Sequence, residues 1–178
     1  AELNNESSRI ASGLNQYGLK KGDRVLLFVP FSIKFISIAF ALFKAGTVPI
    51  LIDPGLGRKN LLKCIEEVEP QGIIAVPIVH AISKVFRKPF RSIQHKVTVG
   101  SCWLWGVKSI EDVCKMAEPR PTYVDVLPND PAAILFTSGS TGSPKGVLYT
   151  HGMFSHQLNA LRSCYGIEPG EIDLPTFP

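Results

Sequence analysis

The chain carries one stretch that combines hydroxyl groups, small residues and a single cation: Phe136-Thr137-Ser138-Gly139-Ser140-Thr141-Gly142-Ser143-Pro144-Lys145-Gly146. Residues 132–136 before it and 146–150 after it form short apolar runs, so we expect a tight connection between two strands. Gly139 and Gly142 allow the backbone to approach an anion with its N–H groups pointing inward. The stretch therefore predicts a loop that holds phosphate groups.

The side chains of this loop favour a phosphate site of a specific kind. Lys145 supplies a compact positive charge. Pro144 before it and Gly146 after it exclude a Walker P-loop, which needs Gly before the Lys and Ser or Thr after it. No G-x-G-x-x-G sequence opens a helix where a dinucleotide site would need one. The alternative, a flexible surface loop rich in Ser and Gly, is disfavoured by the Pro-Lys-Gly ending. Hydrogen bonds to phosphate oxygens are expected from the hydroxyls of Thr137, Ser138, Ser140 and Thr141.

Residues 137–146 resemble the phosphate-loop signature of the adenylate-forming superfamily, which includes acyl-CoA synthetases, peptide-synthetase adenylation domains and luciferases. Residues 42–54, Leu-Phe-Lys-Ala-Gly-Thr-Val-Pro-Ile-Leu-Ile-Asp-Pro, resemble an earlier helix-to-strand motif of this family, and residues 6–25 resemble its opening helix and first core strand. The resemblance spans essentially the whole chain. It implies that ATP and Mg²⁺ are cofactors and that Lys145 is catalytic, because it would stabilise the departing pyrophosphate. It also implies a set of nucleotide-binding residues: Thr137, Ser138, Gly139, Ser140, Thr141, Gly142, Lys145 and Gly146.

Residues 165–178 resemble one branch of the family, the β-lactone synthetases of bacterial long-chain olefin biosynthesis. These enzymes resemble acyl-CoA synthetases, but they activate a 2-alkyl-3-hydroxy acid and close it on its own hydroxyl. The resemblance implies ATP-dependent activation of a long-chain fatty or 3-hydroxy acid as an acyl-adenylate, with release of pyrophosphate and then formation of a β-lactone. Two alternatives remain: a fatty acyl-CoA ligase that forms a thioester with coenzyme A, and a nucleotide-binding remnant without activity.

The resemblance also implies a domain organisation. Members of this family are much longer than 178 residues, so we expect residues 1–178 to be part of the large N-terminal AMP-binding domain, without the mobile C-terminal domain. The family's Tyr-Gly-x-Thr-Glu segment, its ribose-binding Asp, its hinge and the Lys of its second domain are not in this sequence. We therefore expect these residues by themselves not to catalyse adenylation, although the parent protein is expected to be an AMP-forming ligase.

Composition and periodicity predict an α/β fold. The 178 residues are 45% hydrophobic and 19% charged, which provides one sizeable core. Helical and strand patterns alternate, so we expect a layered α/β fold with a largely parallel sheet. The expected strands are 24–29, 47–52, 72–76, 132–136 and 146–150, and the expected helices are 32–45, 60–68 and 78–86, with a further helix start at Ser109 and Asp112.

Several other functions are excluded by local patterns. Residues 25–43 form an apolar run long enough to span a bilayer, but Pro30 and Lys34 divide it into a buried strand and a buried helix, so no integral membrane segment is expected. The net charge is +4, and basic residues gather between 84 and 96. Without a recognised fold motif or regularly spaced stacking aromatics, we interpret that segment as a solvated connector and not as a nucleic-acid site. The expected partner is a small-molecule carboxylic acid. In the thioester alternative, coenzyme A is a second partner.

Cysteine and histidine spacing predicts no metal centre. The four cysteines, Cys64, Cys102, Cys114 and Cys164, form no Cys-x-x-Cys pair, and we expect them to be small buried residues in a reducing cytoplasm.

After the loop, apolar residues recur at i, i+4, i+7 and i+11, which predicts one helix face packed in the core: Phe154, Leu158, Leu161 and Tyr165. His151 and His156 lie about 140° apart on that helix and so do not share a metal-binding face. We interpret His151, where the family has a Thr-His turn, as structural or supporting, and a capped, hydrogen-bonded histidine is at least as well supported here as a catalytic one.

Overall fold

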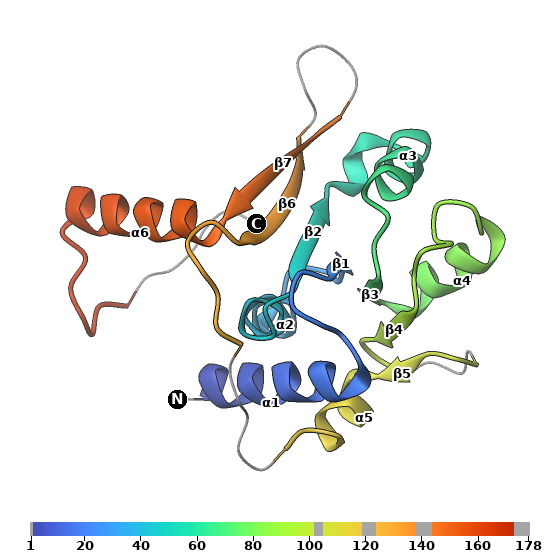
Figure 1. Ribbon diagram of the computed structural model, residues 1–178, viewed down its shortest axis with the longest axis horizontal. Coiled ribbons are helices and arrows are strands. Elements are labelled where there is room, and N and C mark those ends of the chain that lie inside the picture. Colours follow the sequence, from blue (N-terminus) through green and yellow to red (C-terminus); the bar gives the residue numbers. More distant parts are fainter. Residues whose placement is uncertain (1, 102–104, 119–123, 138–143, 173–178) are drawn as a thin grey trace.

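In the computed structural model, which describes residues 2–101, 105–118, 124–137 and 144–172, a seven-stranded sheet forms the centre of the chain (Figure 1). Its strands are β1 (Arg24–Phe28), β2 (Val48–Ile52), β3 (Gly72–Ala75), β4 (His95–Thr98), β5 (Lys108–Ser109), β6 (Pro131–Thr137) and β7 (Lys145–Thr150). They lie in the order β5-β4-β3-β1-β2-β6-β7, and every neighbouring pair is parallel except β6 and β7. The predicted α/β fold with a largely parallel sheet is confirmed.

Helices cover both faces of this sheet. The helices of the described residues are α1 (Glu2–Tyr17), α2 (Ile33–Lys44), α3 (Arg58–Val68), α4 (Pro77–Val85), α5 (Ile110–Lys115) and α6 (His151–Tyr165), with the short 3-10 turn η1 (Pro54–Leu56). In Figure 1, α1, α2 and α5 lie together below the sheet, and α1 contacts both of the others. The helices α3 and α4 lie on its other side.

Two separate hydrophobic cores result from the alternation of side chains along the strands. On β1, Val25 and Leu27 are buried with residues of α1, α2 and α5, whereas Leu26 is buried in the other core, which includes Ile65 of α3. β1 is thus apolar on both faces, as expected for a strand in a sheet that is covered on both sides.

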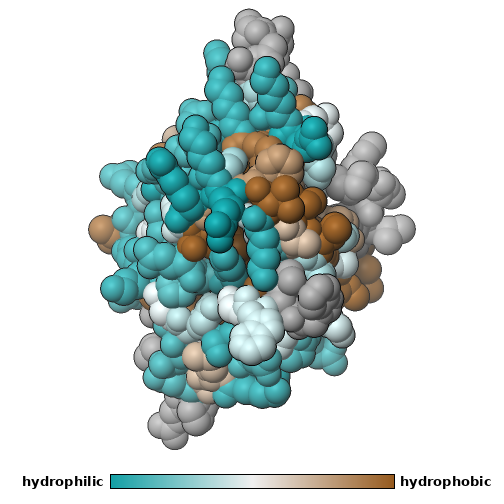
Figure 2. All heavy atoms as spheres, turned by 90° about the vertical axis from the view of Figure 1, so that its right-hand side faces the viewer, coloured by the Kyte–Doolittle hydropathy of each residue, from teal (hydrophilic) through white to brown (hydrophobic). Residues whose placement is uncertain are grey.

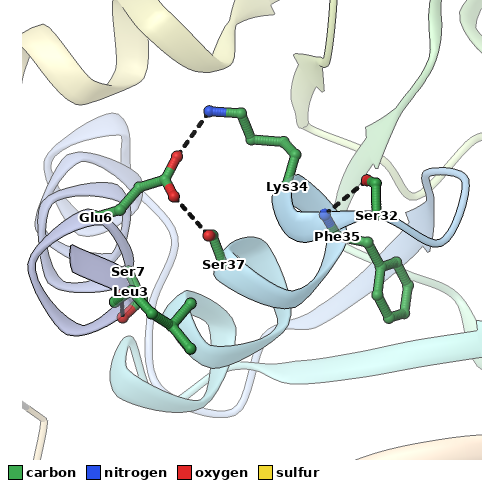
Figure 3. Close-up of polar contacts among 7 residues, drawn as sticks. All are labelled: Leu3, Glu6, Ser7, Ser32, Lys34, Phe35 and Ser37. Atoms are coloured by element: carbon green, nitrogen blue, oxygen red, sulfur yellow. Dashed lines mark hydrogen bonds and ion pairs between the residues drawn. The ribbon is translucent and has the colours of Figure 1, made fainter. Parts of the chain in front are cut away.

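The apolar run at 25–43 is divided by the signals that the sequence shows. Ser32 caps α2 by accepting a hydrogen bond from the Phe35 N–H at 3.2 Å (Figure 3). After the helix, Gly46 has a φ of 69°, its N–H donates to the Phe43 carbonyl, and the Thr47 N–H donates to the Leu42 carbonyl. This left-handed stop favours glycine, which has no Cβ to clash. In the described part of the chain, no helix has the length and apolar character needed to cross a membrane.

A carboxylate joins the first two helices. Glu6 of α1 reaches toward α2, where Lys34 Nζ donates to its Oε1 at 2.8 Å and the buried Ser37 hydroxyl donates to its Oε2 at 2.6 Å (Figure 3). The Lys34 hydrogen bond, and then that of Ser37, hold the pKa of Glu6 below its ordinary value. Because the folded-state pKa is lowered, this contact stabilises the fold above the unfolded-state pKa and is lost as pH falls through the folded value.

We expect Glu6→Gln to lower the free energy of unfolding by about 0.5 to 1 kcal/mol at pH 7, since the ion pair is more than a third exposed and the amide can still accept from Ser37. At an acidic pH low enough to protonate Glu6 in the folded protein, below its lowered pKa, the difference should largely vanish. Urea denaturation of both proteins at the two pH values measures it. Glu2→Gln, on the same helix, is the control and should change stability little at either pH. An equal loss at both pH values would contradict a role for the charge.

Three sequence predictions are corrected by the structure. The face of α6 predicted to lie in the core is largely exposed, with Leu158, Leu161 and Tyr165 at 66%, 42% and 74% exposure, because no described part of the chain covers it. Cys164, on the same helix, is exposed, although Cys64 is buried as predicted, Cys114 is half-buried, and Cys102 lies outside the described residues.

The basic segment 84–96 is also more ordered than the predicted solvated connector. It contains the end of α4 and the start of β4, and between them Phe90 and Ile93 are buried. Its charged side chains are on the surface, as predicted, except that Lys96 is half-buried.

Candidate active site

The predicted phosphate loop is carried by the only antiparallel pair of strands in the described sheet. β6 runs beside β2, with Phe136 paired to Ile52, and then β7 returns along it. In that register Thr137 and Lys145 are direct partners across the two strands. The hydroxyl of Thr137 and the cation of Lys145 therefore belong to residues that lie opposite each other at the end of the strand pair. The other predicted nucleotide-binding residues of the loop lie outside the described residues: Ser138, Gly139, Ser140, Thr141 and Gly142.

Close packing explains the glycine that follows the lysine. The ring of Phe136 is buried beneath the backbone of Gly146, its partner on β7, and a Cβ added at Gly146 would lie 3.1 Å from Phe136 Cζ. A larger residue would push the two strands or the ring apart. The aromatic ring and the glycine thus fix the strand ends that hold Thr137 and Lys145.

The two described ends of the loop, Thr137 and Lys145, lie at the carboxyl edge of the parallel strands, since Thr137 is the last residue of β6 and β6 is parallel to β2. Ligands of open α/β sheets bind at this edge. Both Thr137 and Lys145 are exposed there, and Lys145 makes no ion pair with any described residue. An exposed cation without an anionic partner, beside a hydroxyl, suits a phosphate group.

At the end of β6, beside Leu135 and Phe136, is an apolar cavity of about 610 Å³. Its walls come from the carboxyl ends of β1, β2 and β6 and from the start of α2, and they include Phe28, Phe35, Leu135 and Phe136. Asp53 is the one carboxylate in the wall, and its Oδ1 is already used to accept the Gly55 N–H at 2.7 Å. The cavity suits an apolar group next to the phosphate loop.

A second group of polar residues lies at the opposite end of the β6–β7 pair. There Asp130 Oδ2 accepts the Leu127 N–H at 2.7 Å and pairs with Lys21 Nζ at 2.7 Å. These two contacts, the Leu127 N–H first, lower the pKa of Asp130. The pair joins Lys21 and Asp130, which lie more than a hundred positions apart in the sequence, so no local signal could identify it. Its role is to anchor the chain before β6.

His151 belongs to this far end and not to the loop. It follows Thr150, whose hydroxyl caps α6 by accepting the Met153 N–H, and its own N–H donates to the Asp130 carbonyl. Because β7 has six residues, His151 begins its helix about 17 Å or more from Lys145 along the strand. The histidine therefore lies outside the predicted phosphate site.

Burial favours the neutral form of the His151 ring. Desolvation lowers the pKa of His151, against the attraction of Asp130, and the ring packs edge-on against Phe43 with centroids 6.2 Å apart. Its Nε2 is buried and has no hydrogen-bond partner among the described residues. The prediction of a hydrogen-bonded structural histidine is therefore not met at Nε2.

The most buried of the described histidines is His80, to which the sequence analysis assigned no role. His80 of α4 is 1% exposed, and its Nε2 lies 3.0 Å from the Val97 carbonyl of β4. Burial lowers the pKa of His80. The contact between His80 Nε2 and the Val97 carbonyl joins α4 to β4 of the sheet. In the described ranges, no three His, Cys, Asp or Glu side chains gather as metal ligands would.

Comparisons with known proteins agree with this geometry. The sequence profile of the AMP-binding enzyme family matches residues 1–174. The olefin beta-lactone synthetase of Xanthomonas campestris pv. campestris is 42% identical over 179 residues, which is 100% of this chain and 32% of that protein. The acetyl-coenzyme A synthetase of Pasteurella multocida is 27% identical, over 97% of this chain and 29% of that protein. The chain thus spans about a third of the length of the curated relatives it matches.

Among solved structures, a long-chain-fatty-acid-CoA ligase from Archaeoglobus fulgidus superposes with a TM-score of 0.81 at 24% identity. The superposition covers 93% of this chain and 32% of that one, and it shows a shared fold.

Proposed function

Because the chain belongs to the AMP-binding enzyme family, we propose that the protein it comes from activates a long-chain carboxylic acid with ATP and then closes the activated acid to a β-lactone. The observation that carries the first step is the pairing of Thr137 with Lys145 at the carboxyl edge of the sheet. The 42% identity to an olefin beta-lactone synthetase over the whole chain supports the second step.

The first step makes a poor electrophile reactive. A carboxylate oxygen of the acid attacks the α-phosphorus of ATP, the bond from that phosphorus to the bridging oxygen breaks, and pyrophosphate leaves with the electron pair. Negative charge grows on the leaving pyrophosphate. Lys145 and the Thr137 hydroxyl, with the loop between them, would stabilise this charge because they are preorganised by the strand pair. The acid's alkyl chain would find an apolar surface in the adjacent cavity.

The two cofactors fit this part of the chain unequally. The exposed cation and hydroxyl at the ends of the loop suit the phosphates of ATP. For Mg²⁺, the described residues bring together no set of three carboxylate, imidazole or thiolate ligands, so we assign the ion no ligand and no step here. A divalent ion bound by the phosphates themselves would neutralise part of their charge.

The second step distinguishes a lactone from a thioester. In the lactone route the 3-hydroxyl oxygen of the substrate attacks the acyl carbon, the bond from that carbon to the AMP oxygen breaks, AMP leaves, and the hydroxyl proton is released. A nucleophile held within the same molecule has a high effective concentration, so no thiol site is needed. In the alternative route the thiol of coenzyme A attacks instead, and the relation to acetyl-coenzyme A synthetase keeps this alternative open.

We expect the full-length protein, given ATP, Mg²⁺ and a long-chain 2-alkyl-3-hydroxy acid, to form the β-lactone and AMP without coenzyme A. Mass spectrometry of the product, with and without coenzyme A, measures this. The same acid lacking the 3-hydroxyl is the control: it should support exchange of pyrophosphate into ATP but give no lactone. A product that strictly requires coenzyme A would reject the lactone step alone, and absence of acid-dependent exchange would favour the inactive remnant.

A further inference from the structure

The outward face of α4 is apolar. Ile78, Ile82 and Val85 recur at i, i+4 and i+7, and they are 63%, 40% and 74% exposed. A surface helix normally turns its apolar stripe inward and its polar residues to solvent. Here the inward residues His80 and Ser83 are buried polar groups, and the stripe faces outward. Figure 2 views the side of the molecule that carries α3 and α4, and it shows apolar side chains bordered by hydrophilic ones.

The surroundings of this stripe are strongly basic. The sequence has no Asp or Glu between Glu69 and Glu111, but it has six Lys or Arg residues there. Lys88 and Arg91 pair with glutamates of α3 and the turn after it, at 2.7 and 3.4 Å. Lys84 and Arg87 are exposed and make no ion pair with any described residue. These two cations help to line a basic cavity of about 630 Å³.

An apolar groove borders the stripe on the side of α3. It has a volume of about 490 Å³ and is lined mainly by aliphatic and aromatic side chains, including Leu61, Ile82 and Phe86. Arg58 is the one charged residue in its wall; its guanidinium lies 5.8 Å from the centre of the Phe86 ring, and it pairs with no described carboxylate. The stripe, the groove and the two cations thus all belong to α4 and its immediate surroundings.

We propose that this face, defined by Ile78, Ile82, Val85, Lys84 and Arg87 and called here the α4 face, docks the protein on the surface of an anionic lipid bilayer. The apolar stripe enters the boundary between headgroups and acyl chains, and the two cations contact lipid phosphates, as in other interfacial helices. The complementary charge of an anionic surface favours this occupant. A nucleic acid would satisfy the cations but leave the stripe in water. The inference is independent of the proposed reaction.

Sedimentation of the full-length protein with vesicles tests this docking. We expect at least tenfold stronger binding to vesicles of phosphatidylcholine with a quarter of phosphatidylglycerol than to phosphatidylcholine alone, and weaker binding in 0.5 M salt. Ile78→Ser/Val85→Ser should weaken binding to anionic vesicles by tenfold or more. The matched control, Ile33→Ser/Leu158→Ser, removes side chains that are 83% and 66% exposed on other helices and should leave binding unchanged.

A charge reversal tests the contribution of the cations of the α4 face separately from that of its apolar stripe. Lys84→Glu should weaken binding several-fold, whereas Lys20→Glu, an equal change of charge near the start of β1, should not. Absence of vesicle binding, equal binding to neutral and anionic vesicles, or equal losses in test and control variants would overturn the proposal. Loss with Lys84→Glu but not with the Ile78 and Val85 variant would instead indicate a polyanion site. Exchange of pyrophosphate into ATP with a short soluble acid should be unchanged in all of these variants. This control distinguishes a loss of vesicle binding from a loss of the proposed reaction.

Discussion

Replacing Lys145 with alanine is expected to slow the adenylation half-reaction by a factor of about 100 to 1000, because one preorganised donor to a developing charge contributes about that much to a rate. Lys145 is exposed, unpaired among the described residues and opposite Thr137, so its loss leaves the fold intact and removes only charge from the loop. Acid-dependent exchange of labelled pyrophosphate into ATP, measured on the full-length protein, reports this half-reaction directly.

Two comparisons make the Lys145→Ala result specific. Lys145→Arg keeps the charge but changes its shape and reach, so it should recover part of the activity. Lys20→Ala, an exposed lysine far from the loop, should exchange at the normal rate. A correctly folded Lys145→Ala protein with normal exchange would show that the β6–β7 loop does not hold the leaving pyrophosphate, and the proposed function would lose the observation that carries it.

Replacing Gly13 with alanine is expected to lower the free energy of unfolding by about 2 to 3 kcal/mol, although alanine is the better helix former by about 1 kcal/mol. Gly13 lies where α1 crosses α5, and a Cβ there would stand 2.1 Å from the Val113 carbonyl oxygen and 2.7 Å from its carbon. Backbone atoms cannot rotate away as a flexible side chain could, so the two helices must separate and open the core beneath them.

Urea denaturation of the Gly13→Ala protein measures this loss, with Asn5→Ala on the exposed face of the same helix as a control that should change stability little. Val113→Ala added to Gly13→Ala should not restore stability, because the obstacle is the carbonyl group and not the valine side chain. Rescue by that second change would show that side-chain crowding alone limits the contact.

The sequence was most informative where one local signal determines local structure. Ser32 and Gly46 predicted both ends of α2 correctly, because a cap and a left-handed stop act within a few residues. The strand expectation around residues 132–150 likewise placed Thr137 and Lys145 at the two ends of one connection, and their pairing in the sheet agrees with it.

Features that depend on distant parts of the chain could not be predicted in this way. The spacing of Leu158 and Leu161 correctly indicated one helix face, but periodicity does not say what covers that face, and the prediction of a buried face was wrong. Periodicity likewise does not predict that the apolar stripe of α4, formed by Ile78, Ile82 and Val85, faces solvent. Neither the pair of Lys21 with Asp130 nor the contact of His80 with β4 has a signature in nearby sequence, because each joins segments that only the folded sheet brings together.

The position of β6 beside β2 has a consequence during synthesis. About 80 residues separate the end of β2 from the start of β6, so at about 5 to 20 residues per second the ribosome needs roughly 4 to 16 seconds to supply the partner strand. Throughout that interval β2 is the edge of the nascent sheet, with its backbone hydrogen-bonding groups unpaired on one side. A pause in translation before residue 131 would prolong this exposure, during which the unpaired edge of β2 could pair with another chain.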